Sequence, residues 1–126
     1  MKPDILVRDY QAACAKLAAA LGKKEATELE RAGAIQYFEL AFELAWKACK
    51  AKAEELGLTE VRSPRAALRE AMVQGWIGEE SRWLEMLEAR NRMAHVYSAE
   101  QALEVFGRLA DFCRALEDLG KKLGER

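Results

Sequence analysis

Side chains that bind metals or support covalent catalysis are scarce in this sequence. It contains one His (His95), three widely spaced Cys and four scattered Asp. No Cys pair has zinc-ligand spacing, one His cannot build a zinc site alone, and the Asp residues do not form a DxD metal motif. A Gly-rich phosphate loop, an HExxH motif and a nucleophile beside a His are also missing. These absences argue against metal-dependent and covalent catalysis, and predict no metal and no cofactor.

Long apolar runs and a surplus of one charge are missing too. No stretch approaches membrane-spanning length, and the N-terminus lacks the apolar core of a signal peptide. The net charge is −1, so no protein-wide basic surface is available for long nucleic acid such as DNA. Cys14, Cys49 and Cys113 lie among apolar residues, which predicts reduced core thiols. We expect a cytoplasmic protein with no membrane and no DNA partner.

Ala, Leu, Glu, Arg and Lys are abundant, and no segment has the alternating pattern of a strand. With 126 residues and 51% hydrophobic content, the chain fits a single domain over residues 1–126. Thr27 and Glu30 have capping-box spacing, Ser63–Pro64 marks another helix start, and Ser98 a third. Helices are expected over about 4–21 and 27–56, from 63 onward, from 79 to 91 or 93, and over about 98–122. Short connections predict an all-α, five-helix up-and-down antiparallel bundle with a four-helix core.

Three patterns follow the second predicted helix. Its apolar stripe is expected to run from Ile35 to Leu56. Aromatic residues at helical spacing are typical of a core, and less often of a base-stacking platform; they are Phe38, Phe42 and Trp46. A charged ladder is most simply a solvated face, or the rim of a dimer interface; it consists of Glu39, Glu43 and Lys47. None of these patterns decides a function.

The segment RNRMAHVY, residues 90–97, gathers the only His and the only Asn of the chain. Arg90 continues the apolar face of Trp83 and Leu87, so its guanidinium needs a carboxylate, a carbonyl or a phosphate as partner. His95 follows near the N-terminus of the last helix, which attracts anions. Arg90 could stabilise negative charge while His95 moves a proton. The alternative is an Arg paired with a nearby acid and a plain hydrogen-bonding His.

Three blocks of this sequence, together spanning nearly the whole chain, resemble the nucleotidyltransferase substrate-binding family, which belongs to the HEPN superfamily of helical bundles. The blocks are QYFELAFELAWKACK (36–50), SPRAALREAMVQGWI (63–77) and WLEMLEARNRMAHVYSAEQA (83–102). The resemblance implies a homodimer encoded beside a minimal nucleotidyltransferase. The superfamily motif is Arg, four to six residues, then His, matched by Arg90 and His95. In toxins that are paired with a minimal nucleotidyltransferase (HEPN–MNT pairs), the motif extends to a Tyr two residues beyond the His, matched here by Tyr97. The resemblance implies that the partner would modify this Tyr with AMP.

Other candidate residues surround this motif. Asn91 adjoins Arg90 and joins the catalytic candidates. Where many family members carry a small polar pair, this chain has Arg92, Met93 and Ala94, and the extra arginine adds charge at the site. At the start of the third predicted helix, Arg65 and Arg69, together with Arg62, could form a small basic patch. We take Arg92, Arg65 and Arg69 as candidates for binding a substrate or the partner.

Two functions of different class follow. The first is a non-catalytic substrate-binding or partner subunit of a two-protein nucleotidyltransferase system, and the resemblance favours it. The second is a metal-independent endoribonuclease toxin that uses Arg90 and His95 on RNA and is neutralised by AMPylation of Tyr97. The chain is not itself a nucleotidyltransferase, and whether it is an enzyme stays open. One His cannot perform both proton transfers, so a homodimer with helix four or five at its interface is expected.

Overall fold

The fold is described here from a computed structural model, for residues 3–23, 25–95 and 98–125. These residues form five α-helices and one short 3-10 helix, and no strand. The helices are α1 (Pro3–Leu21), α2 (Glu28–Glu55), α3 (Pro64–Val73), α4 (Glu80–Arg92), η1 (Met93–His95) and α5 (Ala99–Gly124). The predicted all-α, five-helix architecture is confirmed.

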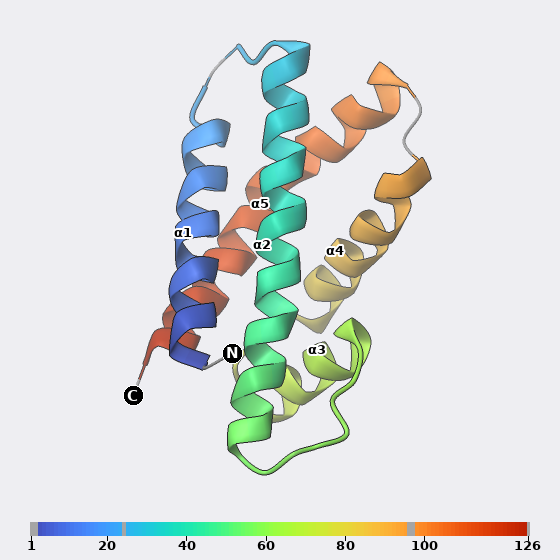
Figure 1. The fold of residues 1–126 in the computed structure, drawn as a ribbon. Coiled ribbons are helices and arrows are strands. Elements are labelled where there is room, and N and C mark those ends of the chain that lie inside the picture. The colour runs from blue at the N-terminus through green and yellow to red at the C-terminus, as the bar shows by residue number, and fades with distance from the viewer. Residues whose placement is uncertain (1–2, 24, 96–97, 126) are drawn as a thin grey trace.

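The helices α1, α2 and α5 contact one another and form the centre of the bundle. In Figure 1, α1 and α2 run side by side in opposite directions, and α5 crosses behind them. The short α3 packs against α2, and α4 returns from there toward the start of α5. The end of α4 and the start of α5 therefore lie at the end of the bundle opposite α3, and residues 90–95 of the RNRMAHVY segment lie there.

Helix starts and stops follow the local signals of the sequence. The Thr27 hydroxyl accepts a hydrogen bond from the Glu30 amide at 3.1 Å, and the Glu30 carboxylate accepts one from the Thr27 amide at 3.0 Å, which completes the predicted capping box. Ser63 and Ser98 cap α3 and α5 in the same way, through their side-chain oxygens. Gly57, with φ of +89°, follows the end of α2, a backbone conformation that favours glycine.

Aromatic rings fill the centre of the bundle. Phe38 and Phe42 of α2 are fully buried, and Phe38 stacks on Phe112 of α5 with ring centroids 5.3 Å apart. Trp83 of α4 lies against Phe42 with centroids 6.3 Å apart. Phe38 and Phe42 are thus core residues rather than a stacking platform for bases. The predicted apolar stripe of α2 was wrong at its end, because Leu56 caps the helix and is 59% exposed.

The three cysteines are buried free thiols, as predicted. Burial raises the pKa of Cys49 to about 12, and that of Cys14 to about 11. Nearby, the buried Tyr10 hydroxyl donates a hydrogen bond to the Leu116 carbonyl and ties α1 to α5, and burial raises its pKa well above the usual value. These groups serve packing rather than chemistry, because a thiol needs its thiolate form to react.

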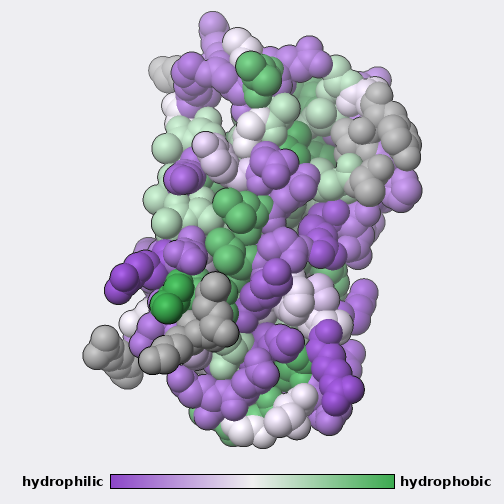
Figure 2. All heavy atoms as spheres, in the orientation of Figure 1, coloured by the Kyte–Doolittle hydropathy of each residue, from purple (hydrophilic) through white to green (hydrophobic). Residues whose placement is uncertain are grey.

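Apolar groups also reach the surface. In the view of Figure 2, hydrophobic spheres interrupt the charged surface along the face on which α1 and α2 lie. Large apolar residues of α2 that are exposed include Leu29, Tyr37 and Leu40. Among the described residues, no helix is long and apolar enough to cross a membrane.

The capping box predicts a measurable contribution to stability. Thr27→Ala should lower the free energy of unfolding by about 1 kcal/mol, because the Glu30 amide at the start of α2 loses its acceptor. Thr59→Ala, in the exposed loop after α2, is the matched control and should change it little. Chemical denaturation followed by circular dichroism measures both. Equal effects of the two substitutions would contradict the role of the box.

Candidate functional site around Arg90 and His95

Arg90 lies in the last turn of α4 and faces α2. Its Nη2 donates a hydrogen bond to Oε1 of Glu43, and the two side chains form an ion pair in which each is about one-third exposed, at 33% and 32%. Its Nη1 donates a second hydrogen bond, to Oδ1 of Asn91 at 3.2 Å. The partner that the sequence analysis required for this guanidinium is therefore a carboxylate of another helix.

Glu43 is itself held in place. Its second oxygen, Oε2, accepts a hydrogen bond from Nε1 of Trp46 at 3.0 Å. One turn earlier, burial raises the pKa of the half-buried Glu39, and the nearby Arg90 guanidinium only partly offsets this shift. The two carboxylates of the α2 ladder thus lie near Arg90, Glu43 in direct contact and Glu39 within electrostatic reach, instead of forming only a solvated face.

His95 occupies a different flank of α4. It ends the 3-10 turn that follows the helix, and its side chain is exposed. It lines a groove of about 280 Å³ between α4 and α5, together with Ala89, Arg92, Gln101, Glu104, Val105 and Arg108. Arg90 is not among the lining residues, so a single chain does not bring Arg90 and His95 into one groove.

Two arginines supply the positive charge of this groove. Arg92 is largely exposed and forms an ion pair with Glu88 at 3.1 Å, within α4. Arg108 comes from α5, where its Nη2 donates to Glu85 at 3.2 Å and its guanidinium lies 5.2 Å from the centre of the Phe112 ring. The packing fixes Arg108. Arg92 stays more accessible to a ligand.

The remaining candidates lie elsewhere. Arg65 and Arg69 are exposed on α3 and line a small depression of about 50 Å³, beside Glu80 of α4. Arg62 forms an ion pair with Glu60 at 3.9 Å. These arginines do not line the His95 groove. Tyr97 lies outside the described residues.

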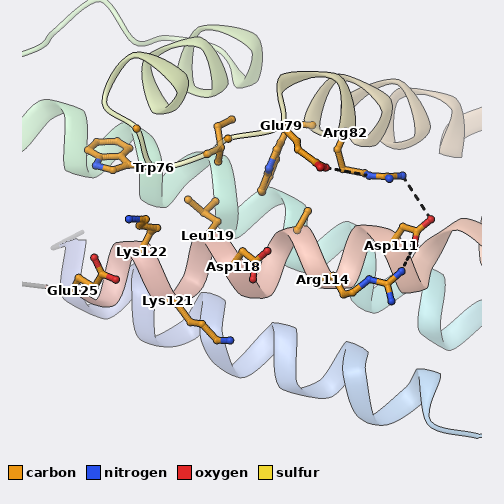
Figure 3. Close-up of a pocket in the computed structure, with 15 residues that line it drawn as sticks. Trp76, Glu79, Arg82, Asp111, Arg114, Asp118, Leu119, Lys121, Lys122 and Glu125 are labelled. Carbon is orange, nitrogen blue, oxygen red and sulfur yellow. Dashed lines mark hydrogen bonds and ion pairs between the residues drawn. The ribbon is translucent and has the colours of Figure 1, made fainter.

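A larger cleft, of about 700 Å³, lies between the α3–α4 turn, the start of α4 and the C-terminal half of α5 (Figure 3). Asp111 contacts both Arg82, at 3.7 Å, and Arg114, as the dashed lines show. The cleft has four cationic and four anionic side chains: Arg82, Arg114, Lys121, Lys122, Glu79, Asp111, Asp118 and Glu125. The charges of this cleft therefore balance, and no imidazole lies among its lining residues, in contrast to the groove at His95.

The family of the chain follows from its sequence and fold. The family model described as "Nucleotidyltransferase substrate binding protein like" matches residues 6–125. The chain therefore belongs to this family. A Haemophilus influenzae protein named "Probable ribonuclease HepT" is 32% identical over 99 residues, which cover 75% of this chain and 68% of that protein.

Two solved structures share the fold. One, of a protein from Thermus thermophilus, has a TM-score of 0.84 and 32% identity, and covers 92% of this chain and 99% of its own. The other, from Haemophilus influenzae, has a TM-score of 0.82 and 25% identity over 94% of this chain and 99% of its own. It is described as showing the fold of a substrate binding domain of a nucleotidyltransferase.

Three residues that the sequence pattern does not connect with the motif are brought to it by the tertiary structure. Glu43 and Trp46 were assigned to a surface ladder and to the core, and Arg108 was not considered. The first two lie in the 36–50 block, so a signal was present, but spacing alone could not show which helix the ladder faces. Arg108 lies within α5 and carries no motif of its own.

The position of Glu39 predicts a pH-dependent stability. Burial favours the neutral carboxyl, so the folded protein binds this proton more tightly than the unfolded chain does. At a pH above the raised pKa the wild type holds an ionised carboxylate in a partly buried position, and there Glu39→Gln should raise the midpoint of thermal unfolding. As the pH falls through the raised folded-state pKa, wild-type Glu39 becomes protonated and the difference should shrink. A difference that grows toward low pH would contradict this assignment.

Proposed function

We propose that this chain is a metal-independent ribonuclease that works in a two-protein system with a separate nucleotidyltransferase. The observation that carries the proposal is the exposed imidazole of His95 in a groove that also holds Arg92 and Arg108. The sequence alone favoured a non-catalytic binding subunit. A reactive group at an accessible, arginine-lined surface favours the ribonuclease, and so does the similarity to a protein named as a probable ribonuclease.

The chemistry requires a base, an acid and positive charge. A base takes the proton of a ribose 2′-hydroxyl, whose oxygen attacks the adjacent phosphorus while the bond to the 5′-oxygen breaks, and an acid protonates that oxygen. His95 suits either proton transfer, because histidine changes its charge near neutral pH. Arg92 and Arg108 would hold the phosphates on either side. Guanidinium groups also stabilise the charge of the pentacoordinate transition state.

A homodimer would complete this site. One His95 serves one proton transfer at a time, and within one chain Arg90 faces α2 rather than the groove. Two copies whose α4–α5 ends meet would place two motifs at one phosphodiester, with one His95 as base, the other as acid, and Arg90 stabilising the charge of the transition state. The surface needed is small, since a net charge of −1 favours a local contact with RNA over an extended one.

The nucleotidyltransferase partner would supply the chemistry that this sequence lacks. A minimal nucleotidyltransferase binds ATP and its metal ions, and the present sequence contains neither a Gly-rich loop nor a DxD motif for that purpose. The family to which the chain belongs associates it with such enzymes. Transfer of AMP to the phenol of Tyr97 would break the bond between the α- and β-phosphates and release pyrophosphate. The added nucleotide would crowd the groove and add negative charge, which repels RNA.

The ribonuclease proposal predicts that Arg90→Ala and His95→Ala abolish cleavage of a single-stranded RNA, while helical content and thermal unfolding change little. Neither side chain is part of the buried core, so its loss should affect chemistry more than packing. EDTA should leave the rate unchanged. Cleavage that survives in His95→Ala, or that EDTA abolishes, would show that the mechanism is wrong. A wild type that binds RNA without cutting it would favour the non-catalytic subunit.

Arg92→Ala should weaken RNA binding and reduce its salt dependence. If Arg92 contacts one phosphate, the slope of log affinity against log salt should fall by about 0.7, the value for a single strand. Arg114→Ala is the matched control, because Arg114 is also exposed and paired with an acid but lies on α5 outside the His95 groove. Fluorescence anisotropy with labelled RNA at several salt concentrations gives both slopes. Equal slopes for the two variants would remove Arg92 from the RNA contact.

The partner proposal predicts AMPylation of Tyr97. Incubation with the nucleotidyltransferase encoded beside this chain, ATP and Mg²⁺ should add AMP to the wild type and not to Tyr97→Phe, and the modified protein should lose RNA cleavage. Mass spectrometry of proteolytic peptides locates the added mass. Tyr37→Phe, which alters a tyrosine that is 37% exposed, should be modified like the wild type. Unchanged modification of Tyr97→Phe, or none of the wild type, would contradict the proposal.

A further inference from the structure

Three side chains from two helices form a relay that ends at Arg90. Trp46 Nε1 donates to Oε2 of Glu43 at 3.0 Å, and Oε1 of Glu43 accepts from Nη2 of Arg90. Trp46 and Glu43 lie one turn apart on α2, while Arg90 lies near the end of α4. Both carboxylate oxygens are therefore engaged, one by a neutral donor of its own helix and one by the cation of the neighbouring helix.

This arrangement restricts a side chain that is otherwise flexible. Arginine has a long side chain with several rotatable bonds, and an exposed guanidinium in the last turn of a helix samples many positions. Here Glu43 fixes one terminal nitrogen, and Asn91 Oδ1 accepts from the other at 3.2 Å. Five N–H groups belong to a guanidinium, and these two contacts use two of them. A ligand phosphate would have to engage donors that these two contacts do not use.

The acceptor is held as firmly as the donor. A glutamate on a helix surface has free rotation about its side-chain bonds, and an exposed ion pair of this kind contributes little to stability. The indole of Trp46 is half-buried and packs against the core, so its N–H gives Glu43 a fixed anchor. Through these hydrogen bonds, the packed core side of α2 restricts the position of Arg90 at the end of α4.

We propose that Glu43 is a positioning residue for Arg90, with Trp46 fixing the orientation of Glu43. The inference rests on the proposed ribonuclease function, because the position of Arg90 matters only if its guanidinium meets a phosphate. The competing role is an ordinary interhelix ion pair that only fastens α4 to α2. The two roles predict different effects of a Glu43 substitution on kcat when Arg90 is also substituted.

Kinetics of RNA cleavage separate these roles. Glu43→Gln keeps the size of the side chain and removes its charge, and should lower kcat on the order of tenfold or more with little change in KM, because misplaced groups act mainly on the transition state. Trp46→Phe should act in the same direction and more weakly. In an Arg90→Lys background, Glu43→Gln should have a much smaller effect, because lysine has no guanidinium to orient. Circular dichroism confirms that each variant is folded.

Asp111→Asn provides the matched control. Asp111 on α5 forms an interhelix ion pair with Arg82 of α4, just as Glu43 on α2 pairs with an arginine of α4, but it lies outside the His95 groove. This variant should leave kcat near that of the wild type. If Asp111→Asn lowers kcat as much as Glu43→Gln does, Glu43 is only a structural contact. The same conclusion follows if Glu43→Gln lowers kcat equally in the wild-type and Arg90→Lys backgrounds.

A second measurement does not depend on cleavage. The chain has three tryptophans, so its ¹H–¹⁵N spectrum should contain three indole signals, and Trp46→Phe identifies one of them. That signal should shift in Glu43→Gln and in Arg90→Ala, and should keep its position in Asp111→Asn. If the Trp46 indole signal keeps its position in both variants, the relay is contradicted. If the signal shifts in these variants but the wild type cuts no RNA, the proposed function is refuted and Glu43 has no catalytic group to position.

Discussion

The position of the candidate site depends on how α4 is attached to α2. Two contacts join these helices at opposite ends of α4: Trp83 lies against the Phe42 ring, and Arg90 is paired with Glu43. The helices α1, α2 and α5 also pack against one another, through contacts that do not involve the α2–α4 interface. Since His95 follows Arg92 by a single 3-10 turn, any shift of the end of α4 would move the imidazole with it. The contact between the Trp83 and Phe42 rings buries apolar surface, and the ion pair between Arg90 and Glu43 orients the end of α4.

Charge is distributed locally rather than globally in this protein. With a net charge of −1, no long-range positive field attracts nucleic acid, and most arginines form ion pairs with nearby acids. The large cleft of Figure 3 follows that rule, with balanced charges along its walls. The His95 groove has two arginines and one glutamate, Glu104, among its lining residues. An accessible imidazole between two arginines, Arg92 and Arg108, is what distinguishes this groove from the larger cleft.

Local signals in the chain were enough to place the five helices and the starts of α2, α3 and α5. The capping box of Thr27 and Glu30, the Ser63–Pro64 start, the Ser98 cap and the glycine after α2 act within a few residues, and hydrophobic periodicity identified Phe38 and Phe42 as core. The resemblance of its blocks gave the family and the motif. Such signals can be recognised without knowing what lies across the bundle.

The partners of the motif follow only from the way the helices pack. Arg90 and Glu43 are 47 positions apart, and a helical ladder of charges presents the same pattern whether it faces solvent or another helix. The packing of Trp83 on Phe42 sets the rotation of α4, which turns Arg90 toward α2 and leaves Arg92 and His95 facing α5. Spacing along one helix fixes which side chains share a face. The contacts between helices fix what that face meets.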